Sequence, residues 1–143
     1  MEQVFFSNSG AEANECAIKA ARLYAAKKKD LNDGYIITLT NSFHGRTVTT
    51  LAATGQDVFH KDFLPLTEGF VHAAANSKED VVRLTSENKC CAVMFEVVQG
   101  EGGVLPLKAE FLTWLEGFAK ENGLLLIADE VQTGNGRTGT LYA

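Results

Sequence analysis

The feature that most constrains the fold is a run of five apolar residues, 124–128, that ends in two acids, Asp129 and Glu130. Such a run predicts a strand buried on both faces of a parallel sheet. Ligands of open α/β sheets bind at the carboxyl ends of the strands, so Asp129 is expected at a binding site. A carboxylate beside a buried strand is costly without a partner. The sequence therefore predicts a cation at Asp129: an arginine, a metal ion or a protonated ring nitrogen of a cofactor.

Segments with strand and helix patterns alternate along the chain. Strands are predicted at residues 4–7, 35–40, 70–74, 91–98 and 124–128, and helices at 11–28, 47–54, 78–88 and 111–122. Ser9 and Glu12 have the spacing of a capping box at the start of the first helix. This alternation predicts an α/β fold, with a mostly parallel sheet and helices on both of its faces.

Size and composition narrow the function classes. The 143 residues suffice for one domain, but neither end has the polar, flexible residues of a domain boundary, so we expect a piece of a larger protein. The formal net charge of −5 argues against nucleic acid as a partner. No apolar run approaches the ~20 residues of a membrane span. The three cysteines, two of them adjacent, do not form a disulfide framework and favour the cytoplasm.

Loops that follow the first two predicted strands carry residues suited to ligand binding. Gly10 and Ala11 open a helix whose first N–H groups can hold a phosphate, although a plain capped helix has the same pattern. In the next loop, Phe43 can stack on a flat ring and Arg46 can hold a carboxylate through paired hydrogen bonds. A core phenylalanine and a surface arginine are the structural alternatives.

Two further glycine-rich loops follow later strands. The first, residues 99–103, carries Glu101 and follows Glu96, but it is no dinucleotide fingerprint, since position 105 is a leucine. The second, residues 133–139, carries Arg137. A glutamate in an apolar strand needs a partner, so we predict an ion pair between Glu96 and Arg137.

Together the four loops describe a planar, phosphorylated, cationic cofactor beside a substrate carboxylate. Pyridoxal phosphate meets this description, because its pyridine nitrogen needs an acidic partner to stay protonated. A carboxylate–cation pair 4 Å apart is worth roughly 4 kcal/mol at an effective dielectric constant of 20. Such an energy favours ring protonation by about three pKa units.

The same loops resemble the class III pyridoxal-phosphate-dependent aminotransferases. The matching blocks are residues 5–15, 43–47, 99–103 and 129–139, in the order that the family has them, and the resemblance covers essentially the whole chain. Within the class the blocks are most similar to members that use N2-acetylornithine, while members that use ornithine, succinylornithine or 4-aminobutyrate share much of the pattern. The resemblance implies that residues 1–143 are part of the cofactor-binding large domain of a fold-type I transferase, without its later strands and small domain.

The resemblance implies contacts with pyridoxal phosphate for eight residues: Ser9, Gly10, Ala11, Phe43, Asp129, Glu130, Val131 and Gln132. Asp129 would be the catalytic partner of the ring nitrogen. Phe43 and Val131 would pack on the two ring faces, and Gln132 would lie near the phenolic oxygen. The backbone amides of Gly10 and Ala11, helped by Ser9, would bind the phosphate.

The implied reaction moves the terminal amino group of N2-acetylornithine or ornithine to 2-oxoglutarate, a step of arginine biosynthesis. Arg46 would bind the substrate α-carboxylate, and Glu101 would help to distinguish the two substrates. The family resemblance also implies a homodimer, and it places the lysine that binds the cofactor covalently beyond Ala143. Without that lysine and the later strands, we expect the isolated chain to be inactive and poorly stable, with bare strand edges.

Three other interpretations compete with this one. A nucleotide hydrolase could use two acids after a strand, but its phosphate loop needs a Gly-Lys pair, which the sequence lacks. A metal hydrolase needs regularly spaced ligands, which His44, His60 and His72 do not provide. The third reading is a non-catalytic fragment that binds cofactor weakly or not at all.

Overall fold

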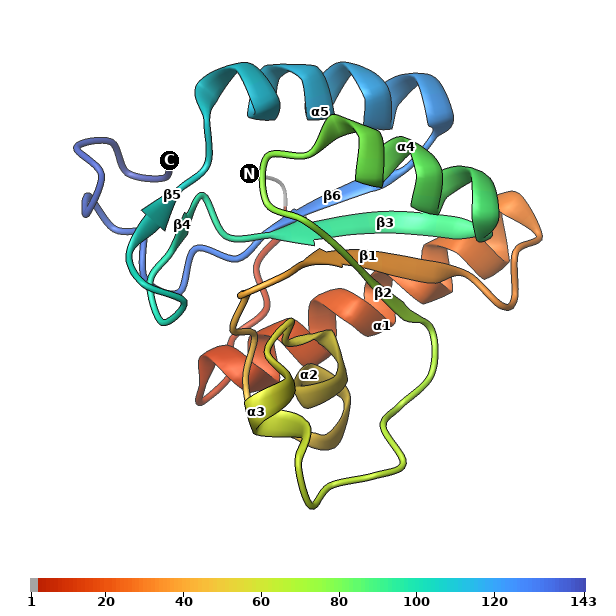
Figure 1. Cartoon of the computed structure of the whole chain (residues 1–143), viewed down its shortest axis with the longest axis horizontal. Helices are drawn as coiled ribbons and strands as arrows, with labels where there is room; N and C mark the ends of the chain where they lie inside the picture. The colour runs from red at the N-terminus through yellow and green to blue at the C-terminus, as the bar shows by residue number, and fades with distance from the viewer. Residues whose placement is uncertain (1–2) are drawn as a thin grey trace.

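The computed structural model describes residues 3–143, and its centre is a four-stranded sheet with the strand order β2-β1-β3-β6 (Figure 1). The strands are β1 (Tyr35–Leu39), β2 (Phe70–Ala73), β3 (Cys90–Phe95) and β6 (Leu125–Ala128). All neighbouring pairs of these strands are parallel. A small antiparallel pair, β4 (Val98–Gln99) and β5 (Leu105–Pro106), follows β3.

Helices cover both faces of the sheet, which confirms the predicted fold class (Figure 1). The long helix α1 (Gly10–Lys29) lies on one face, with the short helices α2 (Val48–Ala53) and α3 (Asp57–His60) on the same side. The helices α4 (Lys78–Glu87) and α5 (Ala109–Asn122) lie on the other face. None of the helices in residues 3–143 combines the length and apolarity that crossing a bilayer requires.

The core consists of two apolar layers, one on each face of the sheet. Ile18 of α1 packs with Ile36 and Met94 in one layer, and Phe111 of α5 packs with Val93 in the other. Alternate side chains of a strand point to opposite faces, so β1 and β3 contribute to both layers. Burial of each such side chain stabilises the fold by roughly 1.5–3 kcal/mol, which fixes the helices against the sheet.

The start of α1 follows the predicted capping pattern in part. The Ser9 Oγ accepts a hydrogen bond from the Glu12 N–H at 3.2 Å. The Glu12 carboxylate, however, accepts from the N–H of Asn8, the residue before the cap, at 2.7 Å. Both bonds satisfy N–H groups at the helix start, and they fix the direction in which the chain enters α1.

Two strand predictions are wrong. Residues 4–7 form no strand but an exposed irregular segment, because no strand within residues 3–143 lies beside them to pair with. The strand β6 is not buried on both faces; Leu126 keeps 39% of its surface exposed. It is an edge strand of the sheet, and an apolar run does not distinguish an edge strand from a central one.

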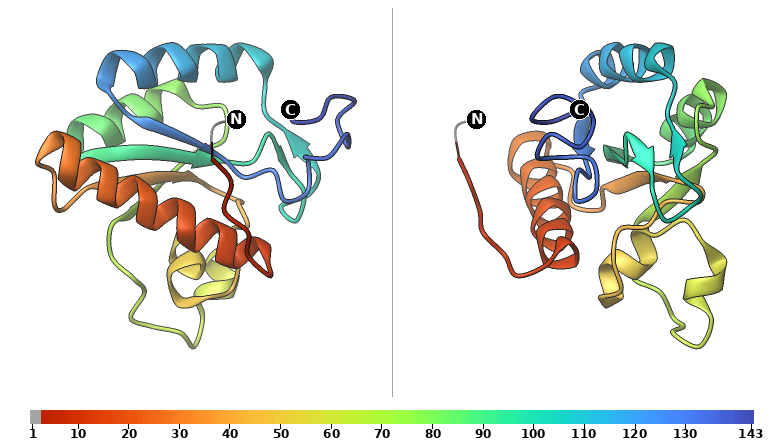
Figure 2. Two further views of the ribbon diagram at one scale, coloured as in Figure 1. Left: turned by 180° about the vertical axis from the view of Figure 1, so that it is seen from behind. Right: turned by 90° about the vertical axis from the view of Figure 1, so that its left-hand side faces the viewer.

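The parallel arrangement gathers the loops that matter at one edge of the sheet. The loops after β1, β3 and β6 all leave the carboxyl ends of their strands, and the start of α1 lies at the same edge (Figure 2). The C-terminal loop after β6 lies next to β4 and β5 (Figures 1 and 2). This edge therefore brings the four predicted binding loops together.

Candidate cofactor site

A cavity of about 300 Å³ opens where these loops meet. Its lining comes from the start of α1 and from the loops after β1, β3 and β6: Gly10, Ala11, Asn14, Phe43, His44, Gly45, Arg46, Glu96, Val98, Asp129, Val131 and Gln132. Seven of the residues predicted from the sequence to contact cofactor or substrate are among them: Gly10, Ala11, Phe43, Arg46, Asp129, Val131 and Gln132.

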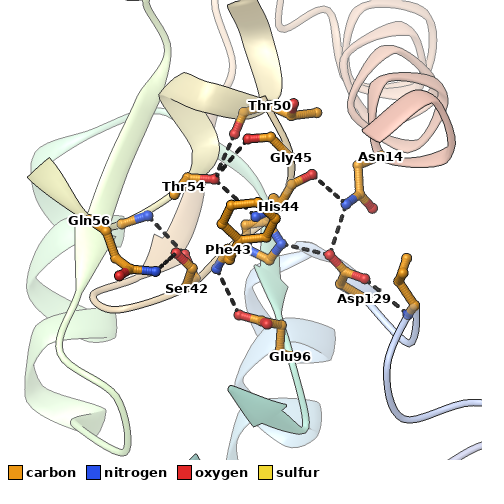
Figure 3. A network of polar contacts seen from close by, with 12 residues as sticks. Asn14, Ser42, Phe43, His44, Gly45, Thr50, Thr54, Gln56, Glu96 and Asp129 are labelled. Carbon is orange, nitrogen blue, oxygen red and sulfur yellow. Dashed lines mark hydrogen bonds and ion pairs between the residues drawn. The ribbon is translucent and has the colours of Figure 1, made fainter. Parts of the chain in front are cut away.

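Asp129 is the centre of a buried hydrogen-bond network (Figure 3). Its Oδ2 accepts from the Asn14 side-chain amide and meets the Nδ1 of His44, both at 2.8 Å. Its Oδ1 accepts from the Val131 backbone N–H at 3.1 Å. The carboxylate is therefore fixed by three protein groups while it lines the cavity.

Asn14 joins two of the loops, a role that the sequence analysis missed. The same amide nitrogen that reaches Asp129 also donates to the backbone oxygen of His44 at 2.8 Å (Figure 3). Asn14 lies on the face of α1 that also carries the buried residues Ile18, Ala21 and Ala25. A polar amide on an otherwise apolar helix face was the signal, since buried polar groups require partners.

His44 is a second member of this network whose role is not evident from the sequence. Its side chain is 1% exposed, and its backbone N–H donates to the Thr54 hydroxyl at 2.9 Å. Among the residues that the structure describes, the ring Nε2 has no hydrogen-bond partner. The Nδ1 of His44 faces the Asp129 carboxylate at 2.8 Å, and an Nδ1–H in this position donates a hydrogen bond that orients the carboxylate.

The environment keeps Asp129 ionised. Burial alone would raise the pKa of its carboxyl group, but His44, the Asn14 amide and the Val131 N–H stabilise the anion and lower the pKa below its ordinary value of 3.8. A buried, ionised carboxylate that lines a cavity attracts a cationic ligand. A protonated ring nitrogen is such a cation.

Glu96 holds the loop that carries Phe43. Its Oε2 accepts from the Phe43 backbone N–H at 3.0 Å (Figure 3). Burial raises the pKa of Glu96 to about 7, although this hydrogen bond opposes the shift. The predicted ion pair with Arg137 is wrong: no such pair occurs within residues 3–143, because the exposed Arg137 lines a neighbouring cavity of about 390 Å³.

The start of α1 is shaped for a small anion. A Cβ atom on Gly10 would come within 2.8 Å of the Val131 side chain, so only glycine lets the helix start approach the loop after β6. Ser9 accepts from Glu12, and no protein group within residues 3–143 accepts from the N–H groups of Gly10 and Ala11. Two N–H donors at a helix N-terminus suit a phosphate group.

Three other predicted site residues lie outside the cavity lining. The Ser9 hydroxyl is used as the helix cap. The Glu130 carboxylate accepts from the Thr133 hydroxyl at 3.3 Å and from the Ala143 N–H at 2.7 Å. Glu101 is exposed, and it accepts a hydrogen bond from the Gln56 side-chain amide, which also donates to the backbone oxygen of Ser42 at 3.2 Å. Their predicted roles remain predictions.

Comparison with known proteins identifies the family. The sequence profile of the class-III aminotransferases matches residues 1–143. The chain belongs to this family. The recognition of this class from the sequence blocks is thereby confirmed, and the α/β fold of the chain is that of a class-III aminotransferase.

Individual proteins similar to the chain in sequence or structure are also aminotransferases. Acetylornithine aminotransferase of Haemophilus ducreyi is 52% identical over the whole chain, and succinylornithine transaminase of Salmonella heidelberg is 49% identical over 99% of it. The chain spans 36% and 35% of the lengths of these two proteins. Ornithine aminotransferase from Toxoplasma gondii, crystallised with partial occupancy of PLP at its active site, superimposes with a TM-score of 0.90. It is 33% identical, and the match covers 95% of this chain and 33% of that one.

Proposed function

We propose that the chain is part of the cofactor-binding large domain of an enzyme that transfers the terminal amino group of N2-acetylornithine or ornithine to 2-oxoglutarate. The family of the chain and its PLP-bound structural neighbour indicate pyridoxal phosphate as the cofactor. The observation that carries the proposal is Asp129, a buried and ionised carboxylate on a cavity that also has an aromatic ring and a helix N-terminus. Those three groups fit a protonated, flat and phosphorylated ring.

Different residues of the cavity would bind different parts of the cofactor. The N–H groups of Gly10 and Ala11 would bind the phosphate, and Phe43 and Val131 would pack against the ring faces. Asp129 would hold the proton at the ring nitrogen, with Asn14 and His44 fixing its orientation. The bound cofactor supplies an electron-withdrawing ring that stabilises negative charge on the carbon that loses a proton.

Substrate recognition would depend on two charged residues. Arg46, on the cavity lining, would bind the α-carboxylate of the amine donor. Glu101, outside that lining, would help the enzyme to accept two different substrates in turn. The whole enzyme would be a homodimer of the cytoplasm that acts in arginine biosynthesis. These three points rest on the family resemblance, and the location also on the free cysteines Cys16, Cys90 and Cys91.

A hybrid enzyme provides the test. Residues 1–143 replace the matched segment of the Haemophilus ducreyi acetylornithine aminotransferase, to which they are 52% identical. We expect the hybrid to convert N2-acetylornithine in the presence of 2-oxoglutarate and added pyridoxal phosphate. Asp129→Asn should lower kcat/KM at least about 100-fold, because the ring proton loses its charged partner.

The control removes a carboxylate at the opposite end of the strands. Asp33 is exposed and pairs with Lys89 at 3.0 Å, so Asp33→Asn should leave turnover unchanged. A folded hybrid that turns over no amine donor, or an Asp129→Asn variant with near-normal turnover, would contradict the proposed function. Circular dichroism and the melting temperature of each variant establish that the protein is folded.

A further inference from the structure

The Arg46 guanidinium lies against two aromatic rings. Its Cζ is 4.6 Å from the centroid of the Phe59 ring and 5.8 Å from that of the Phe43 ring. No ion pair joins Arg46 to an aspartate or glutamate anywhere in residues 3–143. The electron-rich face of an aromatic ring attracts a guanidinium without accepting hydrogen bonds in the way that a carboxylate does. The two contacts therefore restrain the exposed Arg46 and leave its N–H donors to a ligand in the cavity.

Phe59 is itself held in position by its short helix. The Phe59 N–H donates to the backbone oxygen of Gln56 at 3.0 Å. The neighbouring His60 places its Nε2 3.0 Å from the Leu51 oxygen and 2.7 Å from the Thr54 oxygen, both at the end of α2. These contacts join α3 to α2 and fix the side from which Phe59 approaches Arg46.

The Phe59 ring also contacts the ring of Phe43. The two centroids are 5.6 Å apart with an interplanar angle of 74°, an edge-to-face contact. Phe59 thus touches both the residue expected to stack on the cofactor and the residue expected to bind the substrate carboxylate. It does not line the cavity, so its effect on a ligand passes through these two neighbours.

The acidic residues around the cavity explain why an aromatic contact that restrains Arg46 is useful for substrate binding. Glu96 and Asp129 line the same cavity as Arg46. A guanidinium free to rotate would be attracted to either carboxyl group, and a pair formed there would use the donors that a substrate needs. A contact with an aromatic ring restrains the cation without supplying a competing negative charge.

We propose that Phe59 is a specificity-determining residue, which positions Arg46 so that the site selects amine donors that carry a carboxylate. The proposal rests on the proposed function, in which Arg46 binds that carboxylate. It predicts a loss confined to carboxylate recognition when the Phe59 ring is removed. Donors without a carboxylate gain nothing from Arg46 and should not respond.

The test compares two donors in the hybrid enzyme with saturating pyridoxal phosphate. One is N2-acetylornithine, and the other is N-acetyl-1,4-diaminobutane, the same molecule without its carboxylate. Phe59→Leu should raise the KM for N2-acetylornithine about fivefold, which corresponds to about 1 kcal/mol, the usual size of a cation–π contact. The KM for the second donor, and both kcat values, should change less than about twofold.

Matched variants separate positioning from general damage. Phe59→Tyr keeps the ring and should have the native KM for N2-acetylornithine. Val58→Ala alters an exposed neighbour in the same helix and should leave the KM for both donors unchanged. An equal rise in KM for both donors, or no rise for N2-acetylornithine, would overturn the proposal. A native hybrid that is folded but inactive on both donors would instead contradict the proposed function.

A second measurement does not depend on turnover. In the hybrid enzyme with isotope-labelled arginine, NMR of the Arg46 side chain should show Nε–H and Cδ proton signals shifted upfield by the Phe59 ring current. Phe59→Leu should remove most of that shift, and Phe59→Tyr should retain it. Arg46 signals at ordinary positions in the folded native hybrid would overturn the proposed contact even if the Phe59→Leu variant fails to fold.

Discussion

At the scale of single residues, the site depends on an asparagine that carries no chemistry of its own. Asn14 uses one side-chain nitrogen to reach both the His44 backbone oxygen and the Asp129 carboxylate, each at 2.8 Å. Neither a leucine nor an aspartate can make these two donations, because an amide NH₂ supplies two hydrogens. The orientation of Asp129 therefore depends on a helix that comes more than a hundred residues earlier in the chain.

Replacement of this asparagine should weaken cofactor binding. In the hybrid enzyme we expect Asn14→Leu to raise the dissociation constant of pyridoxal phosphate about tenfold or more, since a lost hydrogen bond to a charged group is worth about 1.5–3 kcal/mol. Fluorescence titration of the cofactor-free protein measures this constant. Asn32→Leu, at an exposed turn, is the control and should leave it unchanged. Equal affinities for native and Asn14→Leu proteins would show that Asp129 needs no such support.

At the scale of elements, Glu96 connects the ends of β1 and β3. Its carboxyl group accepts from the Phe43 N–H and is buried, with a pKa raised to about 7. A raised pKa means that the protonated form stabilises the fold. That stability is fully present below the ordinary value of 4.5 and is lost as the pH rises through about 7.

A glutamine at this position should remove the pH dependence. Its side-chain amide is neutral at every pH, and the amide oxygen can still accept from the Phe43 N–H. We expect Glu96→Gln and the native hybrid enzyme to be equally stable at about pH 4. At about pH 8 the variant should be more stable, by about 3 kcal/mol. Melting temperatures at the two pH values measure the difference, with Glu116→Gln on the exposed side of α5 as the control. A constant offset between native and Glu96→Gln proteins would contradict the assigned pKa.

The sequence predicts the helices and strands that depend on local pattern. It does not predict strands or contacts that depend on residues far away in the chain. Asp129 is found at the predicted edge because parallel strands must end together there. Residues 4–7 have the composition of a strand, but hydrogen bonding requires a partner strand, and local composition cannot supply one. The roles of Asn14 and His44 are not evident from the sequence, because their common partner Asp129 reaches them only when α1 and the loop after β1 pack beside the end of β6. Sequence spacing does not reveal that packing.

At the scale of the whole molecule, apolar surface remains uncovered. The edge strand β6 exposes Leu126, and the segment before α1 exposes Phe5 and Phe6 to 68% and 88%. An open strand edge with apolar side chains is a template for pairing with another chain. In the relatives that the chain matches, about two-thirds of the protein lies outside the matched region.

The isolated chain should therefore self-associate. We expect sedimentation velocity to show larger species as the concentration rises, and Leu126→Lys to reduce them, because a charge on an edge strand opposes pairing. Val58→Lys adds the same charge to an exposed site on α3 and should have no such effect. A native chain that stays monomeric and unfolds cooperatively at an ordinary midpoint would contradict this expectation.

The contact between Gly10 and Val131 bears on the order of events during biosynthesis. The two residues lie far apart in the sequence and line the same cavity, and Asn14 and Asp129 likewise meet there from distant positions. A ribosome that has released only the first part of the chain has therefore exposed half of each pair. Vitamin B6 in the cell therefore meets both halves of each pair only after β6 has emerged and docked, so capture of the cofactor follows folding of this segment and cannot guide its early steps.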